Sequence, residues 1–260
     1  MKKLLFGLII CCLSASVAQA QIYYKLAYQV GIPAGQMHRN IPKNAQGIVG
    51  ELGLHMQGSP ITFGWHWGLA MYAHQSTKEL RVFDVGAQSR VLVDVNNYFT
   101  QSHFFVNYEF RQKKFFRPYA SVGLGRSHFR TFMNISAETS TPDCPKPLET
   151  SFPLKDKVMH YMVGGGIKLE LSPLLSMKAG KSFCLDFQMQ HTRGGKVDYL
   201  TLRQTPTATP DATPVYAKFA SQAKPEVIHP YYAGDTHTSR VRLFTFQIGL
   251  AYTGFLGSIE

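Results

Sequence analysis

After residue 20 the sequence has no long apolar run that is free of charged residues. A helix that spans a bilayer needs about 20 such residues, so helical spans are excluded from this part of the chain. Acidic residues are also few: 16 Asp and Glu stand against 27 Lys and Arg, and the net charge is +11. Such an excess of positive charge indicates an anionic partner.

The first 20 residues have the three parts of a secretory signal peptide. Two lysines come first, an apolar core follows over residues 4–13, and Ala18-Gln19-Ala20 forms a small-x-small cleavage site. We therefore expect a signal peptide over residues 1–20. The mature chain, residues 21–260, has the natural length of one domain.

Cysteine is scarce beyond the expected cleavage site. Only Cys144 and Cys184 remain there, which is too few for a disulfide scaffold. Export makes lipid headgroups or polysaccharide better candidates than nucleic acid for an anionic partner. An exported chain without helical spans is either soluble or a membrane barrel, because only helices and closed barrels satisfy every backbone group in lipid.

Apolar and polar residues alternate with a period of two, which in a β-strand separates two faces. The alternating segments are residues 22–32, 46–57, 62–72, 103–111, 119–125, 159–170, 183–190 and 244–252. Each is near the roughly 10 residues that a tilted membrane strand needs. The pattern predicts eight strands.

The composition of the two faces separates a soluble sandwich from a barrel. In the clearest segment Phe63, Trp65 and Trp67 alternate with Gly64, His66 and neighbouring small residues. Small residues with a few charges suit the inside of a narrow barrel, whereas a row of large aromatics is a costly surface unless lipid covers it. We expect an all-β, eight-stranded antiparallel up-and-down transmembrane β-barrel.

The connections between the predicted strands differ in length. Residues 58–60, 112–116 and 172–180 form short connections, and the others are longer, the last running over about residues 193–238. Outer-membrane barrels have short periplasmic turns and long extracellular loops. We therefore expect both termini in the periplasm.

Three motifs resemble the small outer-membrane barrels of the OmpA/OmpX type, which are often labelled porin-like. They are the segment 117–125 (RPYASVGLG), the turn Leu171-Ser172-Pro173, and the last strand 247–255 (QIGLAYTGF). The last strand looks like the terminal signal read by the barrel-assembly machinery, although Gly254 stands where a bulky residue is usual. The resemblance implies a place in the outer membrane of a Gram-negative cell and a role for that machinery in biogenesis.

Charged residues fall on the inward face of the predicted barrel. They are Lys25, Glu51, Glu109, Arg111, Lys168, Glu170 and Asp186. In so narrow a lumen we expect them to pair, because an isolated buried charge is expensive. A salt-bridged plug is the favoured interpretation, and a gated pore in which Arg111 and Lys168 exchange acidic partners is the alternative.

Basic residues gather near the expected outer ends of two strands. Arg126, Arg130, Arg240 and Arg242 are candidate contacts for lipopolysaccharide phosphates, since arginine binds phosphate in a bidentate manner; an ordinary solvated rim is the alternative. Three histidines, His74, His103 and His160, are expected at the external ends of strands. Their spacing predicts no metal site, and no cofactor is expected.

The sequence favours a structural or interaction protein over an enzyme. His191-Thr192 is the nearest approach to a base beside a nucleophile, and it lacks an orienting carboxylate. We expect a scaffold that acts through its extracellular loops around a plugged lumen. The alternatives are a small-solute channel, an accessory subunit of an envelope machine, and, with less support, a lipid A-modifying enzyme.

Overall fold

The structure is a computed structural model that describes residues 20–41, 43–84, 87–110, 115–137, 147–177, 181–202, 213–220 and 228–254. Its strands and one short helix are β1 (Ala20–Pro33), α2 (Gln36–Asn40), β2 (Ala45–Met56), β3 (Ile61–Asp84), β4 (Ala87–Glu109), β5 (Phe116–Ala137), β6 (Pro147–Glu170), β7 (Ser182–Thr201), β8 (Thr213–Ala220) and β9 (Ile228–Gly254). No helix within these ranges is long and apolar enough to cross a membrane.

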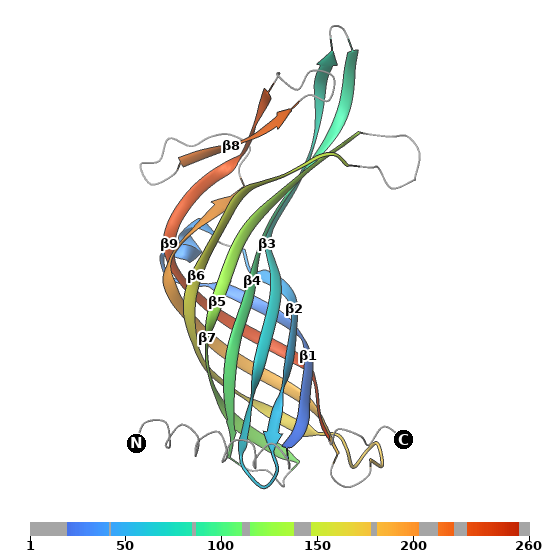
Figure 1. Cartoon of the computed structure of the whole chain (residues 1–260), viewed down its shortest axis with the longest axis vertical. Helices are drawn as coiled ribbons and strands as arrows, with labels where there is room; N and C mark the ends of the chain where they lie inside the picture. The colour runs from blue at the N-terminus through green and yellow to red at the C-terminus, as the bar shows by residue number, and fades with distance from the viewer. Residues whose placement is uncertain are drawn as a thin grey trace, which may run out of the picture.

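The sheet closes on itself as a barrel (Figure 1). Each strand from β1 to β7 pairs antiparallel with the next, β7 pairs with β9, and β9 pairs with β1 over Ile22–Pro33. Eight strands therefore form the ring, and β8 adds to the outer part of β9 alone. The predicted eight-stranded antiparallel barrel is confirmed.

Alternation along the strands sorts side chains between the lumen and the outer wall. On β1, Tyr23, Lys25 and Ala27 are buried inside, whereas Tyr24 and Leu26 are 47% and 68% exposed. Such a surface is stable only where lipid covers it. We call the outward apolar side chains the apolar band; its exposed members are Tyr24, Leu26, Tyr28, Ile48, Leu52, Trp65, Trp67, Leu69, Met71, Phe104, Tyr108, Val122, Leu124, Met159, Tyr161, Val163, Phe187, Met189, Phe244, Phe246, Ile248 and Leu250.

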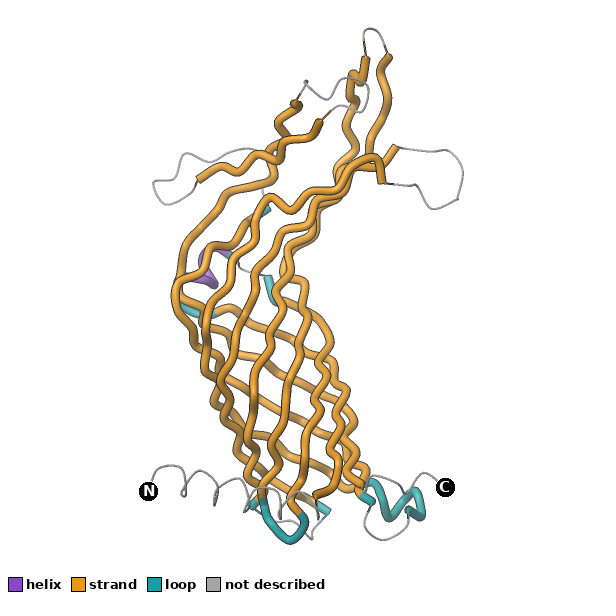
Figure 2. The backbone as a smooth tube through the Cα atoms, viewed as in Figure 1, coloured by secondary structure: helices purple, strands orange, loops and turns teal. Residues whose placement is uncertain are grey.

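Short turns and both described chain ends lie at the same end of the barrel (Figure 2). The turn between β2 and β3 spans residues 57–60, with Gly58 at φ 73°, a conformation that glycine adopts without strain. The described turn after β6 runs to Met177. Of the predicted short connections, 58–60 is confirmed, whereas most of 112–116 and the end of 172–180 lie outside the described residues.

Most of the segments predicted as long loops are strands. β3 and β6 have 24 residues each and β4 has 23, far more than the roughly 10 that a bilayer requires. They rise beyond the apolar band as a curved extension (Figure 1). Residues 193–238, predicted as one loop, contain the end of β7, β8 and the start of β9.

The extension was missed because its apolar face points the other way. Within the apolar band most inward residues are polar or small and the outward residues are apolar, but in the extension the inward residues of β4 are Val91, Val93 and Val95, all buried. These valines belong to a cluster inside the extension that also contains Met133, Ile135, Leu200 and Ala233. Once a wall leaves lipid for water, its apolar face must turn inward.

Candidate functional site

The lower lumen is filled by an ion-pair network centred on Lys25. The Lys25 Nζ lies 3.6 Å from Glu51 Oε1 and 3.7 Å from Asp186 Oδ2, and all three side chains are almost fully buried. Lys25 also donates to Gln247 Oε1 at 3.1 Å. Gln188 Oε1 accepts from it as well. Two carboxylates and two amides thus surround one ammonium group, an arrangement that balances the cost of burying its charge.

A second group of charges lies closer to the short turns. The Lys168 Nζ is 2.6 Å from Glu109 Oε1, and Arg117 places Nη2 2.8 Å from Glu170 Oε2 and Nη1 3.8 Å from Glu109 Oε2. The sequence argument missed Arg117, although it has the same inward parity as Tyr119 two residues later. It precedes Tyr119, the first residue of the alternating segment 119–125, so the alternation did not include it.

The predicted lumenal charges can now be placed. Arg111 lies outside the described residues, and the pore interpretation that depends on it is not tested. The others face the lumen: Lys25, Glu51, Glu109, Lys168, Glu170 and Asp186.

Two buried tyrosines fill the space between the charges. Tyr23 donates to Glu51 Oε2 at 3.1 Å and Tyr119 donates to Asp186 Oδ1 at 2.8 Å. The Lys168 Nζ lies 4.8 Å from the centroid of the Tyr23 ring and 5.2 Å from that of Tyr119, as in cation–π contacts. The Tyr119 ring fits because Gly166 opposite has no Cβ, which would come within 2.7 Å of it.

Three histidines continue the network toward the outside. His66 Nδ1 lies 3.0 Å from Glu51 Oε1, the rings of His66 and His103 stack at 4.1 Å, and His160 Nε2 lies 3.4 Å from His103 Nδ1. His103 and His160 were predicted at the external ends of their strands. This placement is wrong, because β4 and β6 extend well beyond them, and both histidines lie inside the barrel.

His74 is an outlying case. It is exposed, and its Nδ1 lies 2.7 Å from Asn96 Oδ1. Among the residues that the structure describes, no group of three His, Cys, Asp or Glu side chains could hold a metal ion.

An apolar layer packs inside the barrel above the histidines. Phe99 and Phe129 stack at 5.5 Å, and Phe129 lies 6.3 Å from Tyr199. The short helix α2 contributes Met37, which is 1% exposed, to the same cluster. α2 is held in place because Asn40 Nδ2 and Ser239 Oγ both donate to the Tyr199 hydroxyl, at 2.8 Å and 3.0 Å. Buried side chains thus pack inside the barrel at two levels, one charged and one apolar.

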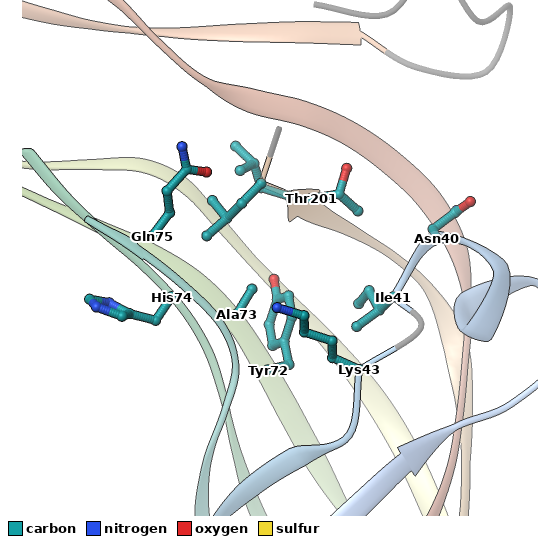
Figure 3. A pocket seen from close by; sticks show the side chains of 10 residues that line it. Asn40, Ile41, Lys43, Tyr72, Ala73, His74, Gln75 and Thr201 are labelled. Atoms are coloured by element: carbon teal, nitrogen blue, oxygen red, sulfur yellow. The ribbon is translucent and has the colours of Figure 1, made fainter. Parts of the chain in front are cut away.

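A pocket of about 240 Å³ lies at the mouth, on top of this apolar layer (Figure 3). Tyr72 and Ile41, which are both members of the apolar cluster, belong to its lining. Lys43 and Gln75 bring polar groups to it, whereas the imidazole of His74 points away from it (Figure 3). The Tyr72 hydroxyl is buried and forms no hydrogen bond of good geometry among the described residues.

The outer wall becomes basic just above the apolar band. The outward cations, which we call the basic band, are Arg126, Arg130, Lys155, Lys157, Arg193, Lys196, Arg240 and Arg242. They lie on β5, β6, β7 and β9, which are consecutive in the sheet. Sequence reasoning found the arginines of β5 and β9 and missed the cations of β6 and β7, although Val158 and Val197, the neighbours of Lys157 and Lys196, lie on the apolar inward face.

The predicted arginines do not lie near the ends of their strands. β5 continues for seven residues beyond Arg130 and for eleven beyond Arg126, and Arg240 and Arg242 lie in the middle of β9. They mark instead the level at which the sheet leaves the apolar band. His128, between the arginines of β5, has a pKa below its usual value, first because of partial burial and then because Arg130, Lys157 and Arg126 surround it.

Comparisons with known proteins find matches among solved structures only. No protein-family model matches the chain, and no curated protein sequence matches it. Neisserial surface protein A is 9% identical, with 90% of this chain and 96% of that chain covered, at a TM-score of 0.37. The N-terminal β-barrel domain of Pseudomonas aeruginosa OprF is also 9% identical, with 90% and 97% covered, at a TM-score of 0.33.

A major outer membrane protein of Thermus thermophilus is 9% identical, with 90% of this chain and 98% of that chain covered, at a TM-score of 0.41. The fold follows from the structure of the chain, which is a closed ring of eight antiparallel strands with an apolar band outside and charges inside. The chain has the fold of a small outer-membrane β-barrel.

Proposed function

We propose that this protein is a non-conducting, non-catalytic barrel of the outer membrane that serves as a scaffold for interactions outside the cell. The observation that supports the proposal is the packing of buried side chains across the lumen at two levels. The Lys25–Glu51–Asp186 network fills the lower part, and the Phe99–Phe129 layer with α2 closes the mouth. A molecule that neither conducts nor offers a catalytic group is left with its outer surfaces as its working parts.

The proposed orientation places the short turns and both ends of the mature chain in the periplasm. The extension then projects from the cell, and residues 1–20 direct export. Two features support this: the strands run far beyond the apolar band at one end only, and the basic band lies at that end, where phosphorylated headgroups would meet it. Partners are accordingly outer-membrane lipids and lipopolysaccharide, an envelope protein on the extension, and the barrel-assembly machinery during biogenesis.

Conductance tests the closed lumen. The mature chain, refolded in detergent and checked by heat-modifiable migration on gels, is inserted into planar bilayers of neutral lipid. We expect no unitary current steps from the wild-type protein. Reproducible steps of fixed size would instead support the small-solute channel and overturn the proposal.

A positive control shows that the assay can detect an open lumen. Truncating both levels at once, with Phe99→Ala and Phe129→Ala above and Lys25→Ala, Glu51→Ala and Asp186→Ala below, removes the groups that fill the barrel. We expect small steps from this variant, provided that it keeps its heat-modifiable migration. Current steps from this variant, together with none from the wild-type protein, would identify the two layers as the barrier to ions.

A further inference from the structure

The outer wall of the barrel has a hollow of about 590 Å³ within the apolar band. It lies across β6, β7, β9 and β1, and the outward side chains around it include Tyr28, Val30, Met189 and Phe246. Gly165 lies in its lining. A Cβ there would come within 2.7 Å of the Tyr119 carbonyl oxygen, so a side chain cannot fill the hollow without moving the backbone. The groove is therefore a fixed feature of the wall.

A basic pocket of about 380 Å³ lies further out on the same side of the barrel. Lys196, Arg240 and Arg242 line it together with Gln36 of α2. Arg193 is opposite Arg242 across the β7–β9 pair and adds a further cation. Asp198 is the next acidic residue along β7, and Thr238 donates a hydrogen bond to its carboxylate. None of these cations forms an ion pair within the described part of the chain.

The strand register fixes how the groove and the basic pocket are aligned. Met189 pairs with Phe246, His191 with Phe244, and Arg193 with Arg242. Four residues along β9 therefore separate the groove from the guanidinium groups, which is about 13 Å at the rise of an extended strand. Between them the rings of His191 and Phe244 stack at 4.6 Å.

The order along these strands matches the order of groups in a phosphorylated lipid. An apolar groove can hold an acyl chain, and the stacked rings of His191 and Phe244 can contact the polar linkage region. The paired guanidinium groups can bind phosphate in a bidentate manner. A small soluble anion would need the basic pocket alone. An uncharged lipid would leave four cations without a partner. The combination favours a single ligand that carries both groups.

We propose that the outer wall at β7 and β9 binds one molecule of a phosphorylated, multiply acylated glycolipid of the lipid A class. One acyl chain lies in the groove beside Gly165, and a phosphate contacts Arg240 and Arg242, with Arg193 and Lys196 beside it. The choice of this lipid over a glycerophospholipid rests on the proposed function, because that orientation puts the basic band in the outer leaflet. The rest of the basic band contributes general attraction, and this site supplies selectivity.

The test counts bound lipid by native mass spectrometry of the full mature chain in detergent, with lipid A, dephosphorylated lipid A, phosphatidylglycerol and inorganic phosphate as separate additions. We expect one lipid A per barrel and at least 10-fold weaker binding of the other three. Equal binding of lipid A and phosphatidylglycerol would overturn the assignment to lipid A. Detergent samples need neither a bilayer nor a conducting pore, so this result is independent of the conductance test of the proposed function.

Two pairs of variants locate the site. Arg240→Gln with Arg242→Gln should weaken lipid A binding at least 10-fold, whereas Lys155→Gln with Lys157→Gln, which removes the same charge from the same band, should change it less than 2-fold. Val30→Trp fills the groove and should also weaken binding at least 10-fold; Val122→Trp, on the wall of β5, should not. Equal losses within either pair would refute the site, and heat-modifiable migration shows which variants have folded.

Discussion

Lys25 is the residue on which the lower lumen depends most. Its ammonium group lies between two carboxylates that are as buried as itself, 3.6 Å and 3.7 Å away. Removing one member of a buried charge group costs more than removing the whole group, because the remaining charges lose their partner in a poorly solvated space.

We predict that Lys25→Met lowers the free energy of unfolding by about 3–5 kcal/mol. Urea unfolding of the barrel in lipid vesicles, followed by tryptophan fluorescence, measures the change. Adding Glu51→Gln and Asp186→Asn to the same chain should restore most of the loss, since no charge then remains unpaired. A single Lys25→Met variant as stable as the wild type would show that the network is solvated.

The pKa of His128 responds to the cations of the basic band that surround it. Partial burial and the neighbouring Arg130, Lys157 and Arg126 hold its pKa below 6.5. The unfolded chain therefore binds this proton more tightly, and the small stability that His128 contributes is complete above pH 6.5 and decreases as the pH falls. We predict that NMR titration finds a pKa below 6.5 and that Lys157→Gln moves it upward. An unchanged value in that variant would mean that Lys157 points away from the imidazole.

At the scale of elements, the strands have two kinds of environment along one continuous sheet. Near the short turns, outward apolar residues face lipid; in the extension, Val91, Val93 and Val95 of β4 pack inward against Leu200 and their other neighbours. The barrel and the extension therefore have separate apolar layers, and the lower ring contains its own closed set of backbone hydrogen bonds.

We predict that Val93→Asp unfolds the extension and spares the barrel. The new carboxylate is buried without a partner among apolar side chains, which costs several kcal/mol. Limited proteolysis should then cut the extension of β3 to β6, while the membrane-embedded fragment keeps its heat-modifiable migration. Asp94, the next residue on β4, faces outward, and Asp94→Asn serves as the control that leaves the extension resistant.

The same change of environment decides how much the sequence could reveal. Alternation with apolar residues outward is found only where lipid covers the wall, so it identified the eight barrel strands and placed Lys25, Glu51 and Asp186 inside. It could not find the extension, where the inward face is apolar and the rule is reversed. The levels of His103 and His160 were wrong for that reason, since strand ends were taken to be the ends of the apolar band.

Some features depend on pairing between distant strands. Arg193 and Arg242 are neighbours only because β7 pairs with β9 past the inserted β8. The closure at the mouth likewise needs α2 to meet Tyr199, which is 159 positions away from Asn40 in the chain. No local pattern contains such information, because it is a property of strand register.

For the molecule as a whole, the proposed closed lumen would depend on two layers that act in series. The charged level and the Phe99–Phe129 level do not share residues, so opening one leaves the other in place. We predict that Phe99→Ala with Phe129→Ala alone gives no conductance in planar bilayers, while losing about 3–5 kcal/mol of stability for each phenylalanine. Current steps from this variant would mean that the charged level is permeable.

The apolar band and the basic band meet within one row of side chains, with Leu124 below Arg126 on β5 and Phe244 below Arg242 on β9. Sinking the barrel by a single row would carry guanidinium groups toward hydrocarbon, and raising it would bare leucine and phenylalanine to water, both of which are unfavourable. The boundary between the two bands thus fixes the depth of the barrel in the membrane. A bilayer whose hydrocarbon thickness differs from the height of the apolar band has to thicken or thin around the barrel, because a change of depth is unfavourable.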